Sequence, residues 1–150
     1  MSAQEIAGFE NPVIAAVLVV RGREICLVFK ESWDKFSLPM TKLQEDERPI
    51  DAAVRAASEC FQGISEQHLE QAGRAHVPQQ SLRYDSWKLY DFHIFRMGGA
   101  EASRPHPGVT CEWHWPTGFV NMELRQISPT ARHIVIDLWD AALEAGQEFP

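Results

Sequence analysis

An apolar run of eight residues, VIAAVLVV at Val13–Val20, constrains the fold of this chain more than any other feature. The run is far shorter than the roughly 20 apolar residues that a helix needs to cross a bilayer. It is rich in β-branched residues and follows Pro12, which is typical of a buried strand. The chain then turns at Arg21–Glu24 and returns as a second apolar strand, Ile25–Lys30. The sequence therefore predicts a hairpin of two core strands.

Two helices are predicted from their start signals. Pro49 suits a first helical position, where its missing N–H costs little. Asp51 is favourable in the first turn because of the helix dipole, and Gly63 is placed to end the run. Ser128 is a good N-cap for the second helix, with Pro129 after it. The apolar stripe of this second helix consists of Ala131, Ile134, Val135, Leu138, Trp139 and Ala142.

The remaining segments predict further strands. A short strand is expected within residues 31–40, and one or two strands are expected within 81–97. Residues 98–108 are dense in Gly and Pro and form the clearest loop, whereas 109–115 alternate like a strand. The polar segment 64–79 has no clear assignment. The order of strand pair, helix, several strands and helix predicts an α+β chain or an α/β/α sandwich on a mixed sheet.

Length and charge limit what this protein can bind. Its 150 residues suit a single domain over 1–150, and a hydrophobic content of 45% can form a real core. The formal net charge of −7 argues against binding to a nucleic-acid duplex, which needs clustered Lys and Arg. A phosphorylated small molecule remains a candidate partner, because one pocket needs only a few basic groups or a metal.

The cysteines indicate the redox setting. Their number is odd, and Cys26, Cys60 and Cys111 form no CxxC pair, so no disulfide framework is expected. A reducing, cytoplasmic location fits best. The first residues lack the basic segment that begins a signal peptide, and no membrane segment is expected.

The stretch from Leu38 to Gly63 resembles the signature of the Nudix hydrolases, G-x5-E-x7-R-E-U-x-E-E-x-G-U, in which U is a bulky aliphatic residue. With Arg55 on the signature arginine, Glu47 falls on the upstream glutamate and Glu59 on the first glutamate of the pair. The similarity extends outside this box to Trp33, Leu38-Pro39, Trp115 and Glu123-Leu124. The resemblance implies a Nudix fold and hydrolysis of a nucleoside diphosphate linked to another group. It also allows a homodimer, which is common in the family.

Four fixed identities of the signature are missing. Thr41 stands in place of its first glycine, and Ala56 in place of the glutamate after the arginine. Cys60 replaces the second glutamate of the pair. Gln62 replaces the final glycine, unless a one-residue insertion shifts that role to Gly63.

These losses affect the metal chemistry that the resemblance implies. In the family, glutamates at the positions of Ala56, Glu59 and Cys60 hold magnesium, which takes oxygen ligands. A methyl group and a thiol do not replace them. The resemblance therefore implies weak or absent magnesium-dependent hydrolysis. Glu59 and Glu47 are the remaining catalytic candidates, and Glu112 is a candidate second metal ligand beside Glu59.

Two interpretations of Arg55 stay open. Arg55 and Glu59 form an ordinary i,i+4 pair, which stabilises a helix modestly. In the family, the arginine and the upstream glutamate help to hold the loop–helix–loop together, so Arg55 and Glu47 are expected to be organisers. Alternatively, Glu59 still acts at a metal.

A second function is consistent with the same residues. A Nudix domain that has lost its carboxylates could be a small-molecule sensor or a partner-binding module, or could carry out metal-independent chemistry. His93 and His114 lie on predicted strands among aromatic residues and are candidates for substrate binding, together with Trp115. A histidine in such a pocket would suit acid/base work. Cys60 is a candidate nucleophile, although a small buried hydrophobe is its default role.

Overall fold

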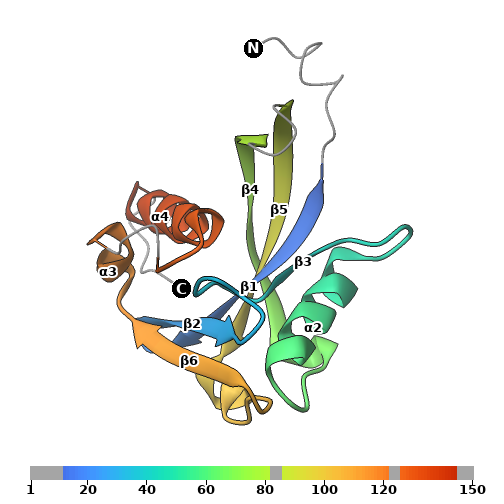
Figure 1. The fold of residues 1–150 in the computed structure, drawn as a ribbon, viewed down its shortest axis with the longest axis vertical. Coiled ribbons are helices and arrows are strands. Elements are labelled where there is room, and N and C mark those ends of the chain that lie inside the picture. The colour runs from blue at the N-terminus through green and yellow to red at the C-terminus, as the bar shows by residue number, and fades with distance from the viewer. Residues whose placement is uncertain (1–11, 82–85, 122–125, 145–150) are drawn as a thin grey trace.

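The architecture is a mixed six-stranded sheet with helices on both faces (Figure 1). The computed structural model describes residues 12–81, 86–121 and 126–144. The strands are β1 (Val13–Arg21), β2 (Glu24–Lys30), β3 (Met40–Lys42), β4 (Leu69–Ser81), β5 (Ser86–Gly98) and β6 (Val109–His114). The helices are α2 (Pro49–Cys60), α3 (Pro116–Asn121) and α4 (Pro129–Glu144), with 3-10 turns η1 (Glu66–His68) and η2 (Gly99–Ala102). The predicted fold class, an α/β/α sandwich, is confirmed.

Strand β1 organises the sheet, whose order is β4-β5-β1-β2-β6. It pairs antiparallel with β2 and β3 and parallel with β5. The predicted hairpin is confirmed, since Arg21 pairs with Glu24 across the turn that contains Gly22. Gly22 has a φ of 61°, a conformation that glycine adopts without strain.

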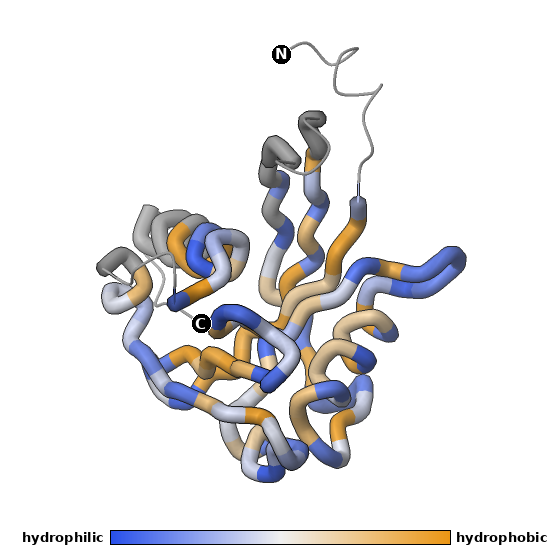
Figure 2. The backbone as a smooth tube through the Cα atoms, viewed as in Figure 1, coloured by the Kyte–Doolittle hydropathy of each residue, from blue (hydrophilic) through white to orange (hydrophobic). Residues whose placement is uncertain are grey.

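The apolar run is continuous because both faces of β1 are covered. Ala15, Val17 and Val19 point to the side of α2. Ala16 and Leu18 point to the opposite side, where α4 packs. A strand that is buried on both faces has no polar alternation, which explains the sequence of this run. Figure 2 shows the apolar residues concentrated along β1 and β2.

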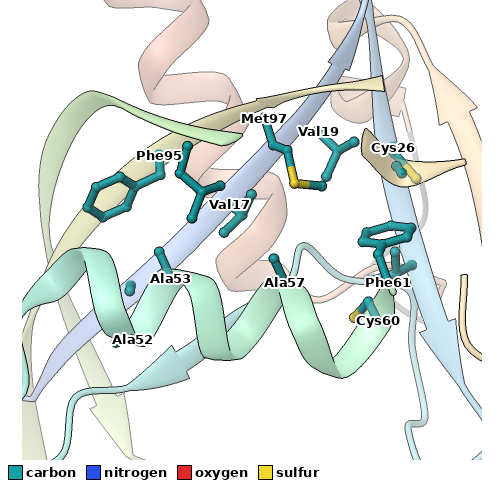
Figure 3. Packing of buried hydrophobic residues seen from close by; sticks show 14 residues of the cluster. Val17, Val19, Cys26, Ala52, Ala53, Ala57, Cys60, Phe61, Phe95 and Met97 are labelled. Atoms are coloured by element: carbon teal, nitrogen blue, oxygen red, sulfur yellow. The ribbon is translucent and has the colours of Figure 1, made fainter. Parts of the chain in front are cut away.

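Two core clusters result, one on each face of the sheet. In Figure 3 the alanines of α2 lie against side chains of β1 and β5, with Phe61 at the helix end near Cys26. The small side chains of Ala53 and Ala57 allow the helix to approach the sheet closely. On the other face, the α4 residues Ala131, Ile134 and Val135 are fully buried. The two predicted helices are therefore confirmed where the structure describes their side chains.

One local prediction is wrong, and the structure adds two elements that the sequence did not predict. The unassigned segment 64–79 contains most of β4, an edge strand that is paired only with β5 and therefore needs little apolar sequence. Within residues 31–40 the structure forms isolated bridges at Phe36 and Ser37 rather than a strand, and β3 begins only at Met40. Helix α3 was not predicted, because its six residues are too few for a periodic pattern. Among the described residues, no helix is both long and apolar enough to cross a membrane.

Candidate functional site

The loop–helix–loop around α2 is held by local contacts at both ends. Arg48 precedes the helix in extended conformation, and Pro49 occupies the first turn as predicted. The guanidinium of Arg48 donates two hydrogen bonds to Asp51, at 2.8 and 3.0 Å. After the helix, Gly63 has a φ of 75°, which supports the prediction that glycine ends this segment.

Arg55 fastens α2 to the preceding loop. Its guanidinium donates to both carboxylate oxygens of Glu47, at 3.2 and 2.9 Å. It also donates to the Thr41 hydroxyl at 3.0 Å and to the Lys42 carbonyl at 2.9 Å. Thr41, which replaces the signature glycine, is thus part of this network. All these contacts bind protein groups to one another, which favours the organising role of Arg55.

Glu47 is fully engaged in the same network. Besides both bonds from Arg55, its carboxylate accepts the backbone N–H of Gln44 at 3.0 Å. The hydrogen bonds from Arg55, and then the one from Gln44, hold the pKa of Glu47 below its ordinary value. Arg55 in turn has a raised pKa because of its bond to Glu47. Both side chains therefore stay charged at neutral pH and stabilise the loop, as an ion pair with two parallel hydrogen bonds does.

Glu59 faces a lysine. Its side chain is 49% exposed, and its Oε2 lies 3.9 Å from the Nζ of Lys30, the last residue of β2. The same ammonium lies over the Trp33 ring, 5.6 Å from the ring centre. The carboxylate is thus accessible, but its charge is partly balanced by a fixed cation.

The other two helix positions at which the signature has glutamates are buried. Ala56 and Cys60 are each only 1% exposed. Burial raises the pKa of Cys60 to about 11, and the nearby charge of Lys30 opposes this effect only in part. Burial likewise raises the pKa of Cys26 and of Cys111, so all three thiols stay protonated at neutral pH. A nucleophilic role for Cys60 is not favoured, because a thiol must ionise to attack.

Glu112 and Glu59 are not brought together. In β6, Glu112 pairs with Leu27 and His114 pairs with Ile25, and both of these partners belong to the core on the α4 side. Glu59 comes from α2, on the other face of the sheet. Glu112, the predicted second metal ligand, instead contacts a histidine of its own strand: the Nε2 of His114 lies 3.1 Å from Glu112 Oε1.

Two cavities flank the segment that follows β2. The larger, about 490 Å³, is lined by Phe29, Phe36, Glu112 and His114 among others. The smaller cavity, about 410 Å³, is lined by Trp33, Leu38 and Met40 among others. Both cavities also have Asp34 and Lys35 in their walls, so they adjoin each other.

The three predicted substrate-binding residues lie in different places. His114 lines the larger cavity, whereas Trp115 is 56% exposed and does not line it. His93 pairs with Ala15 on the α2 side of the sheet, and its Nε2 lies 3.9 Å from Asp91. Asp91 also accepts a hydrogen bond of 2.6 Å from Arg74. His93 therefore belongs to a separate polar cluster on β4 and β5.

The architecture resembles that of known structures at low sequence identity. A NUDIX hydrolase from Nitrosomonas europaea superposes with a TM-score of 0.61 and 16% identity, covering 94% of this chain and 93% of that one. A Nudix hydrolase from M. smegmatis, RenU, gives 0.56 and 15% over 92% and 89% of the two chains. The E. coli ORF135 protein gives 0.58 and 14% over 93% and 95%. No family model and no curated protein matches the sequence.

The chain has the Nudix fold. This bears out the resemblance read from the box, and α2 is the helix that carries the box. Glu123 and Leu124, which also belong to the resemblance, lie outside the described residues.

The magnesium of Nudix hydrolases does not fit the groups present on α2. Octahedral magnesium needs several oxygen donors, and of the three helix positions only Glu59 offers any. A lysine ammonium stands beside it, where it would repel a cation. In the part of the chain that the structure describes, no three His, Cys, Asp or Glu side chains are arranged to hold a metal ion.

Several site residues were missed by sequence reasoning. Lys30 supplies a positive charge beside Glu59. Lys35 supplies a positive charge in the walls of both cavities. Phe29 and Phe36 form an aromatic pair with ring centres 5.3 Å apart at the larger cavity. The only signal for Lys30 was a charged residue at the end of a core strand, a pattern that is usual at strand ends.

Proposed function

We propose that this protein is a divergent Nudix-fold protein that binds a small phosphorylated compound without magnesium-dependent hydrolysis. One observation carries this proposal: on α2, Ala56 and Cys60 are buried, and the carboxylate at the remaining signature position, Glu59, is paired with Lys30. Hydrolysis of a diphosphate in this family relies on a cation to neutralise developing charge. A site that has one carboxylate and its own ammonium does not recruit that cation effectively.

The adjoining cavities support a small-molecule ligand. Their volumes, about 410 and 490 Å³, lie in the range of ligand sites. Aromatic walls from Trp33, Phe29 and Phe36 suit a flat ring, while Lys35 suits an acidic group. His114 and Glu112 offer hydrogen bonds inside the larger cavity. These features favour a nucleoside-like compound with a phosphate.

The test is calorimetry with a panel of nucleoside diphosphates and their conjugates, in magnesium and in EDTA, with turnover measured in parallel. We expect binding that is equal in both conditions and no appreciable product. Turnover with magnesium at an ordinary enzyme rate of about 1–1000 per second would refute the proposal. Absence of binding to every compound would point instead to a protein-interaction module.

A weak residual hydrolase is the second candidate, because Glu59 remains accessible at a signature position and two structural neighbours are Nudix hydrolases. Glu59→Gln separates the two candidates. Under the second, the variant abolishes slow turnover but leaves binding intact.

A cytoplasmic location suits the three free thiols. The homodimer common in the family is a proposal that light scattering would test.

A further inference from the structure

Lys30 lies beside the helix positions at which the Nudix signature has glutamates. It ends β2 on the same face as Cys26 and Val28, which belong to the core beneath α2. Its side chain is only 26% exposed, so the ammonium has a limited range of positions. That ammonium lies 3.9 Å from the carboxylate of Glu59 and over the ring of Trp33.

The charge of Lys30 reaches two of the three positions that carry glutamates in the signature. It contacts Glu59 directly. It also acts on Cys60, where its positive charge lowers the pKa against the larger effect of burial. The third position, Ala56, contributes a buried methyl group. A permanent positive charge therefore stands beside the helix face from which carboxylates would hold a divalent cation.

The contact with Glu59 is weak enough to be exchanged. Its length is at the outer limit of an ion pair, and Glu59 is half exposed. Such pairs contribute little, because water screens them and both side chains lose freedom on pairing. A phosphate carries more charge than a carboxylate and has several acceptor oxygens. It would compete for Lys30 while Glu59 turns to solvent.

We propose that Lys30 is the fixed cation of this site and binds the phosphate of the ligand directly, in place of a metal. The inference rests on the proposed function and extends it to the ligand's chemistry. The ligand is an organic phosphate with a flat or apolar part. This part lies in the smaller cavity, whose wall includes Trp33, Leu38 and Met40. Trp33 connects the cavity with the phosphate position, because this residue lines the cavity and its ring lies beneath the ammonium of Lys30.

The experiment measures ligand binding by calorimetry in EDTA for the wild type, Lys30→Met and Lys30→Arg. Lys42→Met is the matched control for Lys30→Met. The control removes the same charge from an exposed position on β3. The probes are ADP, adenosine and inorganic pyrophosphate. We expect Lys30→Met to weaken ADP and pyrophosphate at least about tenfold, the effect of losing a charged hydrogen bond. Lys30→Arg and Lys42→Met should bind within about threefold of wild type on the same scale.

The outcomes separate this inference from the proposed function. If wild type binds ADP in EDTA and Lys30→Met binds it equally well, the inference is wrong and the proposed function stands. The same holds if adenosine binds as tightly as ADP, since the phosphate then contributes nothing. If wild type binds none of the probes or the nucleotide panel, both are wrong. Thermal unfolding of each variant shows whether a loss of binding follows from a loss of folding.

Discussion

Cys60→Glu restores a signature carboxylate, and we expect it to destabilise the protein without rebuilding a metal site. Cys60 is 1% exposed and belongs to the same buried cluster as Phe61 and Cys26, with Phe61 next to it in Figure 3. Burial raises its pKa from 9.0 to about 11 even with Lys30 nearby. That difference corresponds to about 3 kcal/mol against a negative charge at this position. The larger side chain adds roughly 1–3 kcal/mol of overpacking.

The charge and size effects of Cys60→Glu are separated by pH and by the control Cys60→Gln. A buried glutamate has a folded pKa above its unfolded value of about 4.3, so the folded state binds more protons. Its penalty is absent below the unfolded pKa, grows as pH rises and is complete above the folded pKa. Urea unfolding should therefore show Cys60→Glu about 3 kcal/mol less stable than Cys60→Gln near pH 7.5, but less than about 1 kcal/mol near pH 4.5.

Two results would contradict this reasoning. Equal stability of Cys60→Glu and Cys60→Gln near neutral pH would mean that position 60 tolerates charge, as a metal site must. A rise in melting temperature with about 10 mM magnesium, seen in Cys60→Glu but not in Cys60→Gln, would mean that the ion binds the native state. Either result would mean that the packing around position 60 does not by itself prevent a carboxylate there from acting at a metal.

Three further predictions follow from the same structure. Arg55→Met should speed hydrogen exchange in residues 41–48. It should also reduce the loss of unfolding free energy on acidification, measured by urea unfolding below about pH 4.3. The reason is that Arg55 lowers the pKa of Glu47, whose contribution is present above the unfolded pKa and is lost as pH falls. Phe92→Ala removes a fully buried ring and should cost about 3–5 kcal/mol in chemical denaturation. Gly63→Ala should cost about 1–2 kcal/mol in the same assay, because φ is 75° there although an added Cβ would meet nothing within 4 Å.

The fold could be predicted where burial imposed a hydrophobic pattern on the sequence. Val13–Val20 is apolar throughout because β1 is covered on both faces, and α4 has a stripe because only one face is buried. Strand β4 gave no such signal. It lies at the edge of the sheet, so backbone pairing with β5 stabilises it more than its side chains do.

The candidate site could be predicted only where its residues share one local segment. Glu47 and Arg55 belong to one loop–helix–loop, and the family resemblance implied the organising role that their contact now supports. The face on which Glu112 lies depends on its register with Leu27, and a shift of one residue would reverse it. Lys30 meets Glu59 because the ends of β2 and α2 converge, and this convergence has no trace in the local sequence.

Ala56 and Cys60 stand where the Nudix signature has carboxylates, and this difference is consistent with the presence of Lys30. Three glutamates on one helix turn repel one another unless a divalent cation lies between them. One glutamate beside one lysine is balanced without any ion. The helix face therefore carries less uncompensated negative charge than three glutamates would. Its positive charge is covalently fixed, whereas a bound ion could be lost to chelation. Under the function proposed above, a phosphate that reaches this face meets the ammonium of Lys30 rather than a metal ion, which suits recognition of the ligand more than its cleavage.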